Sequence, residues 1–186
     1  MSIVQRCDFY CPKMMNSLIM FVTMQDVIKN LPSEAAKKRN ENKKFFKRLK
    51  NRPPKNLDYT MKELHEEAFS RIDCLMCANC CKTTGPLFTN ADIERLSKHF
   101  RMKPSLFMEK YLKVDEENDH VLQQLPCVFL GADNHCSIYD VRPKACREFP
   151  HTDRKKFHQI SDLTLKNVAI CPAAFEIVEA MKKRLP

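Results

Sequence analysis

The sequence predicts one compact α+β domain that is mainly α-helical and carries a small antiparallel β-hairpin or sheet. The chain has 186 residues, about the size of one domain, and 44% of them are hydrophobic, which is enough to form a core. Several segments repeat apolar residues every three or four positions, as amphipathic helices do. Segment 127–138 instead has apolar runs on both sides of a turn that contains glycine, which indicates a hairpin.

The N-terminal part of the chain divides into two segments. Residues 1–32 show no sustained period, and we expect them to form a poorly determined extension. Ser33 can cap a helix that runs to about Asn51, because the segment is rich in Ala, Lys and Glu and is followed by two prolines. The predicted organisation is an N-terminal extension at 1–32, a basic helix with its proline linker at 33–56, and a cysteine-cluster domain at 57–186.

Three further helices are predicted from their first turns. Thr60 and Glu63 match a capping box at the start of the second helix. Thr89 and Asp92 open a third helix in the same way, and Pro104 suits the first turn of a fourth. The apolar face of the second helix follows steps of three and four residues: Leu57, Met61, Leu64, Ala68 and Ile72.

The remaining elements are two short strands, a hairpin and a final helix. The pair 121–122 reads as a short strand after an acidic turn at 115–119. The hairpin is expected from the turn residues 131–134 between the apolar runs 127–130 and 136–138. An amphipathic helix after Pro172 completes the chain, with an apolar face that comprises Phe175, Val178, Met181 and Leu185.

The positive charge of the chain is confined to the predicted basic helix. The chain has 32 Lys and Arg against 23 Asp and Glu, a net charge of +9. Residues 37–55 contain ten basic residues and one acid, which accounts for the whole of this charge. The helix could contact phosphates, with Phe45 and Phe46 stacked on bases. We favour a solvated lysine face with both rings packed inward, because aromatic residues on a helix usually pack.

Composition also bounds the class and the compartment. With only two glycines, the chain contains neither a dinucleotide-binding fingerprint nor a phosphate-cradling glycine loop. No run of about 18 apolar residues occurs, so we expect no membrane-spanning helix. The segment 14–24 resembles a secretion signal only faintly, because Asn16 and Ser17 interrupt it and no cleavage site follows. We therefore expect a cytoplasmic protein, whose cysteines bind metal or perform redox chemistry.

Eight of the ten cysteines form two groups. Close Cys-x2-Cys spacing lets thiolates from a short loop converge on one zinc ion or iron–sulfur cluster. An all-sulfur ligand set also argues against magnesium and calcium. The first group lies in the segment 74–81 and the second is widely spaced along the chain. Together they give the predicted metal ligands: Cys74, Cys77, Cys80, Cys81, Cys127, Cys136, Cys146 and Cys171. Cys7 and Cys11 lie outside these groups.

The distribution of these ligands stays open at the level of sequence. A helical segment would place Cys74, Cys77 and Cys81 on one face. A ferredoxin-type loop would instead bring Cys74, Cys77 and Cys80 together. The eight thiolates could fill two four-coordinate sites, or one site with the remaining thiols in reserve.

Arg142 and Arg147 flank Cys146, and we predict that they contribute to cofactor binding. Guanidinium groups beside a thiolate-rich centre would offset its negative charge. The alternative is that Arg142 anchors a turn to a carboxylate such as Asp140. His135 and His151 also lie near the cysteines, but a lone histidine is more often a surface or capping residue. The spacing of the other polar residues indicates no catalytic set.

Several spaced motifs agree in order with a known family. After the first cysteine group come Pro126-Cys127-Val-Phe-Leu, Cys136-Ser-Ile-Tyr, Arg142-Pro143-x-x-Cys146-Arg147-x-Phe149-Pro150 and Cys171-Pro172. Over roughly residues 70–175 the chain resembles the YkgJ-like cysteine-cluster (CxxCxxCC) family, and this resemblance implies a zinc- or iron-chelating domain. The chain is also similar to the cysteine-rich portion of flagellin lysine N-methylases, which implies that some relatives support methyl transfer.

We therefore expect a metal-binding protein that holds an iron–sulfur cluster, such as a [4Fe–4S] cluster, or zinc. Its role would be electron transfer, metal handling or support of a partner enzyme, with a protein or redox partner and neither nucleic acid nor a membrane. One alternative is a metal-dependent modifying enzyme related to protein lysine N-methylases. The other is a zinc-stabilised nucleic-acid-binding module that uses the basic helix.

Overall fold

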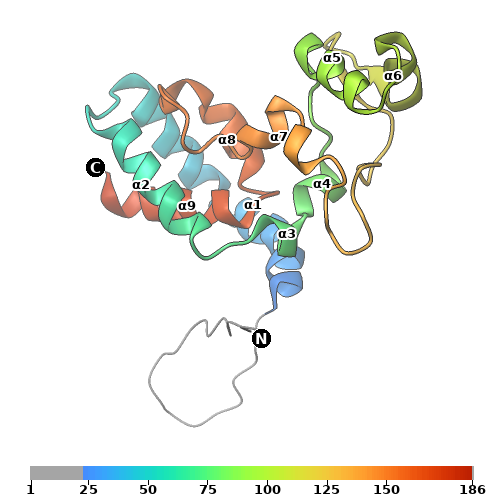
Figure 1. Ribbon diagram of the computed structural model, residues 1–186. Helices are drawn as coiled ribbons and strands as arrows, with labels where there is room; N and C mark the ends of the chain where they lie inside the picture. The colour runs from blue at the N-terminus through green and yellow to red at the C-terminus, as the bar shows by residue number, and fades with distance from the viewer. Residues whose placement is uncertain (1–22, 186) are drawn as a thin grey trace, which may run out of the picture.

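The chain forms two unequal lobes with short helices between them (Figure 1). The computed structural model describes residues 23–185. The larger lobe, the bundle, consists of α1 (Met24–Asn51), α2 (Leu57–Phe69), η2 (Phe157–Ile160), α8 (Ser161–Asn167) and α9 (Pro172–Arg184). The smaller lobe consists of α5 (Asn90–His99), α6 (Pro104–Tyr111), β1 (Leu112–Val114) and β2 (His120–Leu122). The mainly helical α+β fold that the sequence predicts is confirmed.

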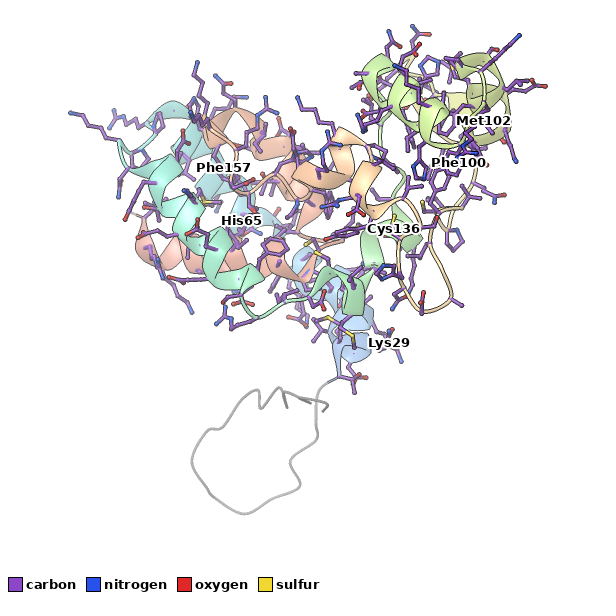
Figure 2. All side chains as sticks on the ribbon, viewed as in Figure 1. Lys29, His65, Phe100, Met102, Cys136 and Phe157 are labelled. Atoms are coloured by element: carbon purple, nitrogen blue, oxygen red, sulfur yellow. The ribbon has the colours of Figure 1, made fainter. Side chains whose placement is uncertain are left out.

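The region between the lobes, which we call the seam, contains three short helices and a 3-10 turn. They are α3 (Cys74–Cys77), α4 (Asn79–Thr83), η1 (Tyr139–Val141) and α7 (Lys144–Glu148). Each lobe has its own hydrophobic core. Figure 2 shows Phe157 in the bundle, Phe100 in the smaller lobe and Cys136 between them.

The bundle core is built from the apolar faces of its helices. In α2 the predicted face is confirmed, since Leu57, Met61, Leu64 and Ala68 are all buried. The final helix packs against α2 with the buried residues Ile177, Val178 and Met181. In α1, Phe45 and Phe46 are 6% and 2% exposed, so both rings pack inward as expected and neither is available to stack on a base.

Helix α1 begins at Met24, and the predicted start at Ser33 is wrong. Thr23 caps the helix, because its side-chain oxygen accepts a hydrogen bond from the Asp26 backbone N–H at 3.2 Å. Pro32 lies inside the helix, where a proline usually costs about 3 kcal/mol. Apolar residues on both sides of it are buried, since Leu31 is 3% and Ala35 5% exposed, and Ala35 belongs to the bundle core. This packing offsets the proline.

Helix α2 also begins earlier than predicted, at Leu57 rather than at Thr60. Thr60 is buried inside the helix, and its hydroxyl accepts a hydrogen bond from the Asn56 side chain at 3.3 Å. The predicted capping box at this threonine is therefore wrong. Packing of Leu57 against the bundle core extends the helix by the turn that precedes it.

The sheet of the described chain lies in a different place from the predicted hairpin. Strands β1 and β2 pair antiparallel around the acidic turn, with Leu112 opposite Leu122. Segment 127–138 folds back on itself as predicted, with an antiparallel bridge between Leu130 and Cys136 and a hydrogen bond from the Ser137 N–H to the Phe129 carbonyl at 2.9 Å, but it does not form two strands. The Cys127 N–H donates to the carbonyl of Cys81 at 2.8 Å, so it is not available to a neighbouring strand of a hairpin.

The first turns of α5 and α6 are as predicted. Thr89 and Asp92 form the expected capping box, and Pro104 occupies the first turn of α6. No helix of residues 23–185 is long and apolar enough to cross a membrane.

The inward packing of α1 predicts which of its substitutions destabilise the protein. We expect Phe46→Ala to lower the free energy of unfolding by about 3–5 kcal/mol, because it removes a fully packed ring. The exposed neighbour Lys47 provides a matched control: Lys47→Ala should change the free energy of unfolding by about 0.5 kcal/mol or less. Urea denaturation followed by circular dichroism measures both. Similar stabilities for the two variants would contradict the placement of α1 in the core.

Candidate metal centre

The segment Cys74–Cys81 folds as two short helices joined at Ala78. The Asp73 carboxylate caps α3 by accepting the Leu75 N–H at 2.8 Å. Ala78 then adopts a left-handed backbone, with φ 47° and ψ 15°, and redirects the chain into α4. The segment is neither the single helix nor the open loop that the sequence allowed.

Two hydrogen bonds attach this segment to distant parts of the chain. The buried Asn79 side chain donates to the carbonyl of Ile170 at 2.6 Å, which brings the neighbouring Cys171 beside it. The Cys81 carbonyl accepts the Cys127 N–H at 2.8 Å. Two cysteines of the second group are therefore held next to the first group by backbone contacts.

The other predicted ligands also lie at the seam. Cys127 and Cys136 pack against the core of the smaller lobe, whereas Cys171 packs against the core of the bundle. Cys146 is carried by α7. Cys74 is exposed, Cys77 is buried, and the other six are half-buried: Cys80, Cys81, Cys127, Cys136, Cys146 and Cys171. Cys7 and Cys11 lie outside the described residues.

Burial keeps most of these thiols protonated in the absence of a metal. It raises the pKa of Cys171 and of Cys146 to about 12, and that of Cys127 to about 11. The charge of Cys81 adds to burial in raising the pKa of Cys127 and Cys146. A bound cation would reverse this balance, because metal ligation requires thiolates.

Adjacent Cys80 and Cys81 behave as a pair. The hydrogen bond between their side chains raises the pKa of Cys80 and lowers that of Cys81. The positive charge of Lys82 also lowers the pKa of Cys81. Within the segment, Cys81 is therefore the thiol that loses its proton most readily.

Arg142 brings positive charge to the thiols. Burial raises the pKa of Cys74, Cys136 and Cys146, and the Arg142 guanidinium opposes this rise at all three. Its guanidinium lies 3.8 Å from the centre of the Tyr139 ring and donates to the Tyr139 carbonyl at 2.6 Å. Among the described residues it makes no ion pair with Asp140.

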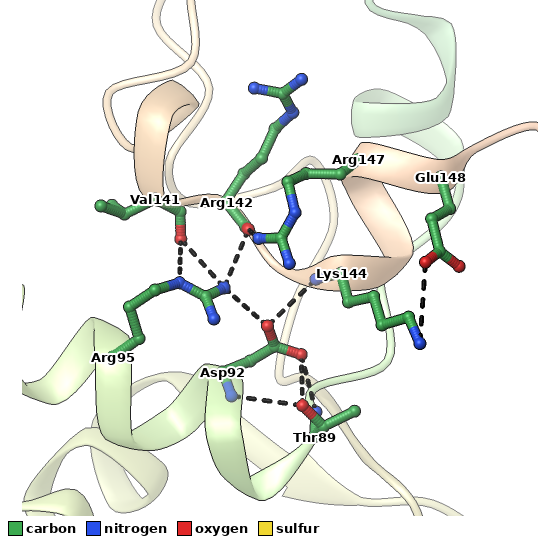
Figure 3. A network of polar contacts seen from close by, with 8 residues as sticks. All are labelled: Thr89, Asp92, Arg95, Val141, Arg142, Lys144, Arg147 and Glu148. Atoms are coloured by element: carbon green, nitrogen blue, oxygen red, sulfur yellow. Dashed lines mark hydrogen bonds and ion pairs between the residues drawn. The ribbon is translucent and has the colours of Figure 1, made fainter.

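Arg147 has a different environment from Arg142. Its side chain is exposed and donates from Nη1 to the Arg142 carbonyl oxygen, so that it braces the backbone beside that residue (Figure 3).

A buried carboxylate that the sequence indicated only as a helix cap orders the same region. Asp92 is 1% exposed and accepts hydrogen bonds from Thr89, from Arg95 at 2.6 Å and from the Lys144 N–H at 3.0 Å (Figure 3). Lys144 is the first residue of α7, the helix that carries Cys146. Asp92 therefore links the smaller lobe to a predicted ligand.

Arg95 extends this network to the preceding turn. Its Nη2 donates to the Arg142 carbonyl at 3.0 Å and its Nε to the Val141 carbonyl at 3.4 Å. The backbone that presents Arg142 is thus held from α5. Only the capping motif of Asp92 was visible in the sequence, because the backbone groups of Val141, Arg142 and Lys144 lie about 50 residues further along the chain.

The two nearby histidines have separate surroundings. His135 is exposed and its ring lies against that of Tyr139, with the centroids 6.5 Å apart. His151 is half-buried, its Nδ1 lies 3.9 Å from Glu148, and burial lowers its pKa. Within residues 23–185, no three His, Cys, Asp or Glu side chains are arranged to hold a metal ion. The donor set thus fits zinc or iron by its chemistry, whereas the structure assembles the thiols without closing a ligand shell.

A helical fold that brings eight cysteines to one seam defines a thiol-rich domain of the metal-chelating class. Residues 73–164 match the model of the CxxCxxCC family, whose description is "Putative zinc- or iron-chelating domain". The matched segment includes every predicted ligand except Cys171. No solved structure is significantly similar to the chain.

The Asp92 network predicts an acid-sensitive contribution to stability. Burial alone would raise the pKa of Asp92, but hydrogen bonds from Thr89, Arg95 and Lys144 hold it below its usual value. The carboxylate therefore stabilises the fold above the unfolded-state pKa of about 3.9, and this contribution is lost as the pH falls through the lower folded-state pKa. We expect Asp92→Asn to lower the free energy of unfolding by about 1.5–3 kcal/mol at neutral pH and much less near pH 2.

The control for this prediction lies on the same helix. Glu94 is exposed, and Glu94→Gln should leave the stability nearly unchanged at both pH values. Urea denaturation at pH 7 and in acid measures the difference. An Asp92→Asn effect that is equally large in acid would contradict the role of the charge.

Proposed function

We propose that the protein is a metal-binding module that holds zinc or an iron–sulfur cluster and serves in electron transfer, metal handling or support of a partner enzyme. The observation that carries the proposal is the collection of thiols from four separate parts of the chain at one seam. Sulfur donors of this number and spacing suit zinc and iron–sulfur centres. The proposed ligands are Cys74, Cys77, Cys80, Cys81, Cys127, Cys136, Cys146 and Cys171.

The positions of the thiols are compatible with loading of a metal by small movements. The backbone segments are already side by side, through the bonds from Asn79 to Ile170 and from Cys127 to Cys81. A cysteine sulfur is redirected by rotation about a single side-chain bond. Such rotations would bring the sulfurs of neighbouring segments closer to a common centre.

Exposure of one edge of the site supports a role that involves a partner. Cys74 is exposed, and the neighbouring Met76 is 66% exposed. An electron-transfer or metal-handling centre must be reached from outside, and this edge provides the access.

Metal content tests the proposal directly. We expect the full chain, purified without air, to contain either zinc or iron with acid-labile sulfide, measured by elemental and sulfide analysis. Cys77→Ser and Cys146→Ser should each reduce this content, because each removes a proposed ligand. The matched control is the double variant Cys7→Ser and Cys11→Ser, which should retain it. Wild-type protein with no zinc, iron or sulfide would overturn the proposed function.

Metal removal should also destabilise the fold. A metal held by thiols from the segment 74–81 and from 127–171 cross-links the seam, and a ligand that binds only the folded state stabilises it. We expect chelation to lower Tm by several degrees, roughly the effect of 1–2 kcal/mol in a domain of this size. Differential scanning calorimetry before and after chelation measures the shift. Identical melting of the two forms would rule out a structural role.

A further inference from the structure

The segment Cys74–Cys81 is attached to both lobes. On one side, α3 packs against α1 of the bundle, and Asn79 holds the carbonyl of Ile170. On the other side, the Cys81 carbonyl holds the Cys127 N–H. The segment therefore contacts the bundle through α3 and Asn79, and the chain of the smaller lobe through Cys81.

The thiols on the bundle side come from α3 and from the start of α9. Cys74 and Cys77 are the first and last residues of α3. Cys171 is the N-cap of α9, where its sulfur accepts the Ala174 N–H at 3.5 Å, and its side chain packs against the bundle core. The bond from Asn79 to Ile170 keeps this cap beside the turn at Ala78.

The thiols on the side of the smaller lobe are held by that lobe. Cys127 and Cys136 pack against its core, and the bridge between Leu130 and Cys136 keeps the two close. Cys146 lies in the first turn of α7, which Asp92 of α5 holds through the Lys144 N–H. All three are therefore attached to the smaller lobe.

The adjacent residues Cys80 and Cys81 divide between these two sets. Successive residues of a helix point about 100° apart, so the two sulfurs of α4 cannot both face one centre equally. The Cys81 carbonyl accepts the Cys127 N–H at 2.8 Å, which places Cys81 next to the thiols that the smaller lobe holds. Cys80 follows Asn79, whose side chain holds the carbonyl of Ile170 and with it Cys171, so we group Cys80 with the thiols of the bundle side.

We propose that the eight thiols form two separate four-thiol metal sites, one on each side of the seam. This inference rests on the proposed function and deepens it. The bundle site consists of Cys74, Cys77, Cys80 and Cys171. The lobe site consists of Cys81, Cys127, Cys136 and Cys146. Each set has the four sulfurs that a tetrahedral zinc ion or a cubane cluster takes, and the thiols release their protons to the solvent as they bind the metal.

Each site joins different parts of the fold. The bundle site links α3 to the start of α9, next to the core of the bundle. The lobe site ties α4 to the two cysteines on the second core and to α7. Because Cys80 and Cys81 are adjacent, loading of both sites fixes the lobes relative to each other through a single peptide unit.

Titration with Co²⁺ tests the division. The reduced full-length chain, free of metal and kept under argon, is titrated while the thiolate-to-cobalt absorption is followed. We expect the wild type to saturate at about two equivalents, and Cys80→Ser and Cys81→Ser at about one each. The double variant Cys74→Ser with Cys80→Ser removes two ligands of one site and should still bind about one. The double variant Cys80→Ser with Cys81→Ser damages both sites and should bind almost none tightly.

The outcomes separate the inference from the proposed function. Equal loss of Co²⁺ in the two double variants, or saturation of the wild type at one equivalent, would overturn the division into two sites while leaving metal binding intact. Wild-type protein that binds no Co²⁺ and is purified without zinc or iron would overturn the proposed function itself. Circular dichroism verifies folding. Should the Cys80 variants unfold, two other double variants make the same comparison. Cys74→Ser with Cys171→Ser removes two ligands of the bundle site and should still bind about one Co²⁺. Cys74→Ser with Cys136→Ser removes one ligand from each site and should bind almost none tightly.

Discussion

The left-handed turn at Ala78 is the constraint on which the arrangement of the cysteines depends. A residue other than glycine in this conformation costs about 1–2 kcal/mol, so the surrounding structure must hold it. The hydrogen bonds from Asn79 to Ile170 and from Cys127 to Cys81 do so, one on each side. Without the turn, α3 and α4 would continue as one helix, and Cys80 and Cys81 would face away from their present neighbours.

The charge of the thiols is a second constraint on the seam. A collection of buried thiolates repels itself, and burial raises the pKa of Cys127, Cys146 and Cys171 well above neutral pH. Protonated thiols avoid the repulsion, and a bound cation would remove it in a different way. Arg142 opposes the effect of burial at three thiols without forming an ion pair with Asp140. The protonation state and the metal occupancy of the site are therefore linked.

In the smaller lobe, one buried carboxylate holds the chain beside the seam in place. Asp92 accepts hydrogen bonds from Thr89, Arg95 and the Lys144 backbone, so its charge is fully satisfied despite its burial. A buried charge with such partners is costly to break and therefore specifies one arrangement. In this chain the arrangement is the position of α7, and with it Cys146. A helix cap thus also acts as a positioning element for the seam.

Local features of the sequence determined much of the fold. The buried faces of α2 and α9, the cap at Thr89 and the proline that opens α6 all depend on residues within a turn or two of one another, so their patterns are visible without the tertiary structure. The cysteines of the segment 74–81 were visible for the same reason, and the family match at 73–164 includes this segment. The association of Phe45 and Phe46 with a core also followed from the helical pattern alone.

Only the tertiary structure decided the features that depend on distant partners. Helix α1 continues through Pro32 because residues on both sides of the proline are buried, and this burial depends on distant parts of the chain. The hairpin expected at 127–138 pairs through a single bridge rather than through two strands, because the Cys127 N–H donates to the carbonyl of Cys81, which lies far earlier in the chain. The side of the seam that each thiol faces follows from the backbone at Ala78 and from two long-range hydrogen bonds. These contacts join residues separated by tens of positions, and their energies exceed the local preferences that a sequence pattern records.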